Sequence, residues 1–371
     1  MGQMNAPVFN VTQTDLEVEV NSYKPGNGLI WPVLFPLKYT SKMTLDGISG
    51  EDGIPVTADR VAFNTKSPKK TRKTVGSWHG RLGKISISRD KDENDINDYN
   101  EQSAIAQSGL IQDKAAAQYL VDMVYDDVKF CSDGMDYRVE LDALRIGSSG
   151  MQVTKEEIDG DTATDDVINF NIPTENYKGV TAIAGTANAD TIKDIAAAQK
   201  AISKKGLKKP MFAIVETETM ELILSEASLA KKVASTILSI AGLEQANEIS
   251  VGVVNAYMQK HGYPQFVVID SYATVEHKDG TKETLKPWNA NVITLSPTVQ
   301  LGWTYYKPVP MVKDTAALQA QGSYFKTTIY SEVNPMLETT MAEAYIQPAL
   351  INRASLVFIN AKKTTWNNGE V

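Results

Sequence analysis

The sequence predicts an α+β protein that combines extended segments, one very long helix and a compact mixed domain. Between Gln112 and Ile146, apolar residues recur in steps of three or four, which places them on one face of a helix. From Tyr177 to about Lys307, short apolar strands alternate with helical segments, as in an α+β domain. The first ~45 residues show no helical period, and their four prolines lie among short apolar runs, so they predict an extended arm.

The long helix is the most regular element that the sequence predicts. A helix of ~35 residues would extend ~50 Å, whereas the average globular helix has ~11 to 12 residues. Gly134 lies within it and is expected to bend or weaken it, at a cost of ~1 kcal/mol relative to Ala. Cys131 is expected to be a small buried core residue rather than a reactive thiol. The predicted apolar face comprises Leu120, Val124, Val128, Cys131, Met135, Val139, Ala143 and Ile146.

The compact domain is expected to contain at least two helices and three apolar strands. The segment DTIKDIAAAQKAISKKG begins with an acid and ends with bases and a glycine, which matches helix dipole and cap preferences. The segment TETMELILSEASLAKKVAS predicts a second, single helix, and KPMFAIVE, QFVVID and NVITLSP predict strands. The tail from Tyr330 returns to extended, turn-rich character.

A long exposed hairpin is expected between the last two of these strands. Asp279-Gly280 lies between alternating segments and is a strong hairpin signal, because tight turns need residues that tolerate positive φ. The adjacent Glu276 and His277 could form a general acid and base of a hydrolase. Successive strand residues point to opposite faces, however, so these two side chains should be directed apart. We therefore interpret the hairpin as architecture.

Composition limits the functional classes. The chain of 371 residues has 42% hydrophobic residues and a formal charge of -8, which suits two or three globular domains and not a dedicated nucleic-acid binder. Its one cysteine permits neither an intrachain disulfide nor a cysteine-rich zinc site. The N-terminal sequence lacks a secretory signal pattern, and no apolar run approaches the ~20 residues of a membrane span. We expect neither export nor a membrane partner.

Motifs for cofactors are weak. The segment from Gly76 to Lys84 fails the spacing of a phosphate-binding loop, and the three histidines are too far apart in sequence for metal-ligand spacing. Asp90 to Glu101 matches several ligand positions of a calcium loop, but Asp95 replaces its turn glycine and a strand precedes it. A solvated acidic face is the stronger interpretation. We predict no cofactor, no metal and no catalytic residues.

Charge is segregated along the chain. Residues 60–89 contain nine Lys or Arg and no Asp or Glu, whereas residues 90–101 contain six acids and one Lys. A basic hairpin from about Ile54 to Ser88 could therefore bind the acidic strip of another copy; the alternative is an ordinary solvated loop. The candidate contact residues are Lys66, Lys69, Lys70, Arg72 and Lys73 in the hairpin, Asp90, Asp92, Glu93 and Asp95 in the strip, and Asp279 and Gly280 in the second turn.

The order of these segments resembles the major capsid proteins of tailed bacteriophages, which have the Hong Kong 97 fold, and in particular the lambda-type major capsid family. The specific marks are YRVELDALRIGSSGMQV at the end of the long helix, VINFNIP after it, and FVVIDSYATVEHKDGTKETLKPWNANVITLSPTVQLGWTYY. The resemblance covers nearly the whole chain. It implies an N-terminal arm at 1–45, an extended loop at 46–95, a peripheral domain with a spine helix at 96–176, an axial domain at 177–321 and a return segment at 322–371.

The resemblance also implies a function. Such proteins assemble into hexamers and pentamers of an icosahedral head around double-stranded DNA, so we expect a virion protein that is assembled in the cytoplasm of a bacterial host and is not an enzyme. The chain starts almost directly with the arm, which implies a separate scaffold protein; a portal protein and a possible decoration protein are further expected partners. The alternatives are an encapsulin-like compartment subunit and a hydrolase using Glu276 and His277.

Overall fold

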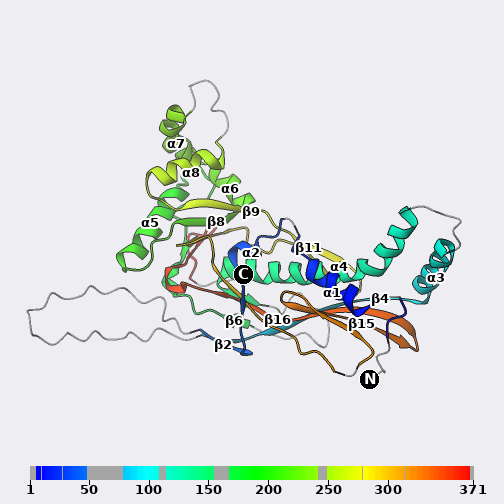
Figure 1. Cartoon of the computed structure of the whole chain (residues 1–371). Helices are drawn as coiled ribbons and strands as arrows, with labels where there is room; N and C mark the ends of the chain where they lie inside the picture. The colour runs from blue at the N-terminus through cyan, green and yellow to red at the C-terminus, as the bar shows by residue number, and fades with distance from the viewer. Residues whose placement is uncertain are drawn as a thin grey trace, which may run out of the picture.

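The computed structural model of the chain shows two large sheets joined by one long helix (Figure 1). The helix, α4, lies across a six-stranded sheet, and a five-stranded sheet with its helices stands at the C-terminal end of α4. The structure describes residues 6–9, 11–26, 28–47, 78–107, 114–153, 167–240, 249–277, 279–313 and 315–367.

Helix α4 (Lys114–Ser149) confirms the predicted long helix. It has 36 residues, which corresponds to ~54 Å. The predicted apolar face is buried from Val128 to Ile146, and the side chains of Leu120 and Val124 lie outside the described residues. At Gly134, a Cβ atom would lie 2.5 Å from Ile87 Cδ1. This glycine therefore allows a strand of the underlying sheet to approach the helix closely.

The six-stranded sheet is organised around the long strand β16 (Met336–Leu350). Strands β15 (Phe325–Val333) and β13 (Gly302–Lys307) pair with successive parts of one edge of β16, and β4 (Gly83–Lys91) pairs with the other. β14 (Leu318–Gln321) and β1 (Leu37–Tyr39) complete the sheet. Together with α4, this sheet encloses most of one large apolar core.

The five-stranded sheet has its own core. Its order is β7 (Tyr177–Gly179), β17 (Val357–Asn360), β12 (Val292–Ser296), β8 (Phe212–Glu216) and β9 (Gln265–Ile269). Every residue of β12 and β17 is buried, as expected for central strands that are covered on both faces. The helices that pack with it are α5 (Thr191–Lys204), α6 (Thr217–Leu224), α7 (Ala227–Ile240) and α8 (Val251–Lys260).

Smaller elements complete the fold. Strands β2 (Thr44–Gly47) and β3 (Trp78–Arg81) form one pair, and β5 (Met151–Val153) and β6 (Val167–Asn169) form another. Helix α3 (Glu93–Gln107) follows β4, and two 3-10 turns lie at Thr174–Asn176 and Arg353–Ser355.

Two expectations about secondary structure were wrong. The arm contains helix α1 (Gln13–Ser22) and the short α2 (Trp31–Leu34); Thr12 and Asp15 form a capping box at the start of α1. The predicted single helix after β8 is broken into α6 and α7. At the break, the buried carboxylate of Glu226 accepts hydrogen bonds from Thr191 N (3.0 Å) and Thr191 Oγ1 (2.5 Å) at the start of α5.

Sheet membership does not follow the expected domain boundaries strictly. Strands β13 and β14, within the expected axial domain 177–321, belong to the six-stranded sheet, and β17, within the expected return segment, belongs to the five-stranded sheet. Within the described part of the chain, no helix has both the length and the apolar character needed to cross a membrane.

Candidate assembly surfaces

The predicted basic hairpin lies mainly outside the described residues. Lys66, Lys69, Lys70, Arg72 and Lys73 belong to the segment 48–77, for which the structure gives no description. Strands β2 and β3, which flank that segment, pair antiparallel with Leu45 opposite Gly80. The role of the five basic residues stays a prediction.

The basic residues on β4 bind acids of the same chain. Arg89 Nη1 lies 3.2 Å from Asp126 Oδ2 and 3.3 Å from Asp127 Oδ1, and its guanidinium stacks over the Phe130 ring at 4.9 Å. The nearly buried Lys91 lies 2.7 Å from Asp127 Oδ2. These pairs attach β4 to α4, so part of the basic run serves the subunit's own fold.

The acidic strip is not one continuous surface. Asp90 accepts a hydrogen bond from Thr339 Oγ1 on β16 (2.7 Å), and Asp92 caps α3 by accepting from Asn94 N (2.8 Å) and Asp95 N (3.1 Å). The hydrogen bond from Asp95 N is the main cause that lowers the pKa of Asp92. Asp95 in turn accepts from Asp92 N at 3.0 Å. The acids on α3 that remain exposed are Glu93, Asp98 and Glu101.

The same segment does not have the shape of a calcium loop. A calcium loop directs its ligands inward from a tight turn, whereas residues 93–107 form a helix that spreads the acids around its axis. Among the described residues, no group of three or more His, Cys, Asp or Glu side chains could hold a metal ion.

The second hairpin is present and is shorter than expected. Strands β10 (Ala273–Glu276) and β11 (Lys282–Leu285) pair antiparallel with Glu276 opposite Lys282. Gly280 has a φ of 80° and donates its N–H to His277 O (2.9 Å), while Asp279 Oδ1 accepts from Thr281 N (2.9 Å). Gly280 therefore supplies the positive φ that the sequence indicated, and Asp279 contributes a hydrogen bond within the turn.

Glu276 and His277 do not form an acid–base pair. Glu276 lies 3.6 Å from Lys282 Nζ, and His277 Nε2 lies 3.2 Å from Glu283 Oε2, so the two residues have different partners. Both pairs cross between the strands of the hairpin. This geometry fits an architectural hairpin.

Residues that the sequence did not single out anchor this hairpin to the body. Lys286 Nζ lies 3.0 Å from the buried Glu216 and 2.5 Å from Glu218, and 5.3 Å from the centre of the Tyr272 ring. The hydrogen bond with Glu218 is the main cause that raises the pKa of Lys286. Little in the sequence indicated this anchoring role, because Lys286 is one of several alternating charges in the segment.

Exposed apolar side chains mark further candidate contact surfaces. Val333 is 78% exposed and Met336 is 41% exposed at the turn between β15 and β16, and Val312 is 63% exposed in the loop before β14. Single exposed apolar residues are common, so it is the grouping at the tip of the six-stranded sheet that makes this turn a candidate.

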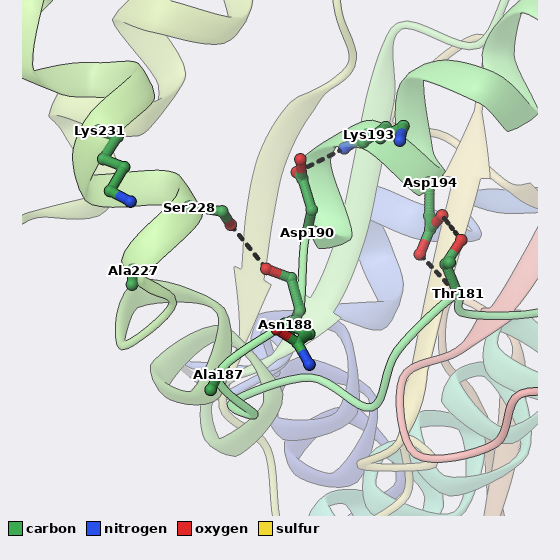
Figure 2. Close-up of a pocket in the computed structure, with 10 residues that line it drawn as sticks. Thr181, Ala187, Asn188, Asp190, Lys193, Asp194, Ala227, Ser228 and Lys231 are labelled. Atoms are coloured by element: carbon green, nitrogen blue, oxygen red, sulfur yellow. Dashed lines mark hydrogen bonds between the residues drawn. The ribbon is translucent and has the colours of Figure 1, made fainter.

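A polar cavity of ≈ 360 Å³ lies between the starts of α5 and α7 (Figure 2). Its polar groups bind one another: Asp190 Oδ1 accepts from Lys193 N (3.1 Å), Asp194 accepts from Thr181 N (2.8 Å) and Oγ1 (2.5 Å), and Ser228 Oγ donates to Ala189 O (2.7 Å). The cavity therefore lies where the starts of α5 and α7 pack together.

Comparisons with known proteins agree with this architecture. No family model matches the sequence, and no curated protein matches it. A phage-related protein from Bordetella bronchiseptica RB50 is similar over 97% of this chain and 98% of its own, with 13% identity and a TM-score of 0.51. A protein assigned to the capsid of a prophage in E. coli CFT073 is similar over 94% of this chain and 99% of its own, with 12% identity and a TM-score of 0.53. The expected fold, that of a phage capsid protein, is confirmed.

Proposed function

We propose that this protein is the major capsid protein of a tailed phage, with the Hong Kong 97 fold. The observation that supports it is the similarity to a protein assigned to the capsid of a prophage, over 94% of this chain and 99% of that one. The Glu276 and His277 side chains bind different partners, which argues against a hydrolase centred on them. The subunit would form hexamers and pentamers of an icosahedral shell around double-stranded DNA.

Within this proposal, the six-stranded sheet and α4 form the peripheral domain, and the five-stranded sheet with its helices forms the axial domain. A separate scaffold protein, a portal protein and a decoration protein would be its partners in a bacterial host. An encapsulin-like shell remains the alternative, and it predicts particles that enclose a protein cargo instead of DNA.

Assembly of the purified protein tests the proposal. We expect sedimentation velocity and electron microscopy to show capsomers or closed shells, alone or with the scaffold protein. A single compact monomer at all concentrations, with and without the scaffold, would contradict a shell function. Shells that contain a specific protein and no DNA in their native source would favour the encapsulin alternative.

We further propose that the basic residues of 66–73 bind the exposed acids of α3 on an adjacent subunit. One exposed ion pair contributes only ~0 to 1 kcal/mol, but the contact would recur at every copy of the interface. Reversing Lys69, Lys70, Arg72 and Lys73 to Glu should therefore weaken assembly. High salt should weaken wild-type assembly too, because exposed pairs are screened within ~8 to 10 Å.

A charge-swapped partner makes this test specific. Subunits with Glu93, Asp98 and Glu101 changed to Lys should assemble poorly alone and should restore assembly when they also carry the four reversed basic residues. Reversal of Lys200 and Lys204 on α5, which are also exposed, is the matched control. If the quadruple variant assembles like wild type at low salt, the basic segment is an ordinary solvated loop.

A further inference from the structure

Three carboxylates of the body hold the arm at three places along its length. Glu338 Oε2 on β16 accepts from Val8 N (2.7 Å) and Phe9 N (3.0 Å). Asp136 Oδ2 on α4 accepts from the Tyr23 hydroxyl (2.6 Å). One turn further along α4, Glu140 Oε2 accepts from Trp31 N (2.6 Å), at the start of α2. The arm is therefore attached to the body by hydrogen bonds that it donates to carboxyl groups.

These carboxyl groups are buried to an unusual degree. Asp136 and Glu140 are 0% exposed and Glu338 is 2% exposed. Among the described residues, no Lys, Arg or His forms an ion pair with Asp136 or Glu140. Desolvation disfavours the charged form of an acid in such a place. Hydrogen bonds to Glu140 from Trp31 N, Ile30 N and Ser271 Oγ act in the opposite direction, but burial is the larger effect and the pKa of Glu140 is raised.

Like charges add to this effect around Asp136. Asp133 and Glu140 lie three and four residues away on α4, positions that share one face of a helix. Tyr23 also donates to Asp133 Oδ1 (2.9 Å), and Tyr324 donates to Asp136 Oδ1 (2.5 Å). Hydroxyl donors stabilise these carboxylates in part, but they add no positive charge.

A cavity lies beside Asp133 and Asp136 of this cluster. It has a volume of ≈ 360 Å³ between the arm and α4. Besides Asp133, Asp136 and Tyr23, the titratable side chains that line it are Glu19, Lys24, Lys129 and Tyr137. The two lysines are the cations closest to the site in this lining, and they balance only part of the acidic charge. Around Glu338, Lys91 opposes the effect of burial and Asp127 adds to it.

We propose that the arm is held by a proton-dependent latch, in which Asp136, Glu140 and Glu338 hold it firmly when they are protonated and loosely when they are ionised. The ionised acids favour a state in which the arm has moved away and water reaches the carboxylates. The two acids on α4 titrate as a coupled set, since they share one buried helix face.

The sign of the pH dependence follows from burial. Burial is the largest cause that raises the pKa of Asp136, Glu140 and Glu338 in the structure described here. An acid with a raised pKa binds its proton more tightly in the closed arrangement than in an open, hydrated one. The latch is therefore strongest below the ordinary carboxyl pKa, and it weakens as the pH rises through the raised value.

Hydrogen exchange of the full-length protein tests the latch. Wild type and Glu140→Gln, which mimics the protonated acid, are labelled together at pH 5 and at pH 8, so that intrinsic exchange rates are the same in each comparison. At pH 5 we expect peptides from 28–35 to exchange at similar rates in both. At pH 8 we expect wild type to exchange faster than the variant, because only wild type then carries a buried charge that favours the open state. Asp136→Asn should have the same effect on peptides that contain Tyr23.

Controls separate the latch from general stability. Glu17→Gln removes an exposed carboxylate from α1 and should keep the wild-type pH dependence, and peptides from β12 should exchange alike in all proteins. Equal arm exchange in wild type and both variants at pH 8 would overturn the proposal. Slower arm exchange in wild type than in the variants at pH 8 would also overturn it, because the charged acids would then be the stronger acceptors.

Discussion

Replacing Gly302 with Ala tests how tightly the arm is packed against the six-stranded sheet. Gly302 begins β13, and a Cβ atom there would lie 2.1 Å from the carbonyl oxygen of Ala349 and 2.5 Å from two atoms of the Phe35 ring. Both distances are far below any real carbon contact. The obstacle on one side is backbone of β16, and on the other it is an arm side chain that is fully buried.

The expected cost follows from these two contacts. Overpacking a core site costs ~1 to 3 kcal/mol. The Ala349 carbonyl cannot move without disturbing the ladder in which Trp303 pairs with Ala349, and a lost hydrogen bond adds ~0.5 to 1.5 kcal/mol. We therefore expect Gly302→Ala to lower the free energy of unfolding by about 2 to 4 kcal/mol.

Urea unfolding of the unassembled subunit, followed by circular dichroism and tryptophan fluorescence, measures this cost. Gly26→Ala is the matched control, because no atom lies within 4 Å of its Cβ position and the same substitution there should be neutral or slightly stabilising. Phe35→Leu combined with Gly302→Ala should stay destabilised, since the carbonyl contact remains. Wild-type stability in Gly302→Ala, or its recovery in the double variant, would refute the reasoning.

Three further predictions concern other parts of the subunit. Burial raises the pKa of Cys131 to about 12, so iodoacetamide at pH 8 should label the thiol only after unfolding; rapid labelling of the native protein would contradict this. Lys286→Met should cost ~3 kcal/mol in urea unfolding by leaving Glu216 buried without its cation, and adding Glu216→Gln should restore most of the loss. Gly280→Val should strain the turn by ~1 to 2 kcal/mol and disturb particle assembly seen by electron microscopy, while helix content by circular dichroism is kept.

Strong periodic signals made much of the fold predictable. The apolar face of α4 recurs from Val128 to Ile146 without interruption, so the helix could be recognised from the sequence alone. The Asp-Gly turn of the second hairpin and the capped helix α5 were predictable for a similar reason, because each has a local chemical cause in a few adjacent residues. Elements with local causes of this kind can be predicted without knowledge of the tertiary contacts.

The arm could not be predicted in the same way. Helix α1 buries only Leu16 and Val20, too few residues to show a period. At the break between α6 and α7, the buried Glu226 binds Thr191, which lies 35 residues earlier in the chain, and a contact so distant in sequence leaves no local pattern. The prediction of the basic hairpin rested on charge alone, and the structure describes only its last residues, 78–88, where Lys84 forms an ion pair with Glu343 of the same chain.

Asp136 and Glu140 show the limit of sequence patterns most clearly. On the sequence they alternate with the apolar face of α4 and look like its solvated side, yet both are fully buried because the arm covers them. The arm also carries apolar side chains into the core, because Trp31, Leu34 and Phe35 are buried within their own chain. The arm therefore completes the subunit's core while its polar attachment rests on acids that burial disfavours in their charged form. In the proposed latch, a rise in pH would therefore release the arm without loss of the underlying sheet.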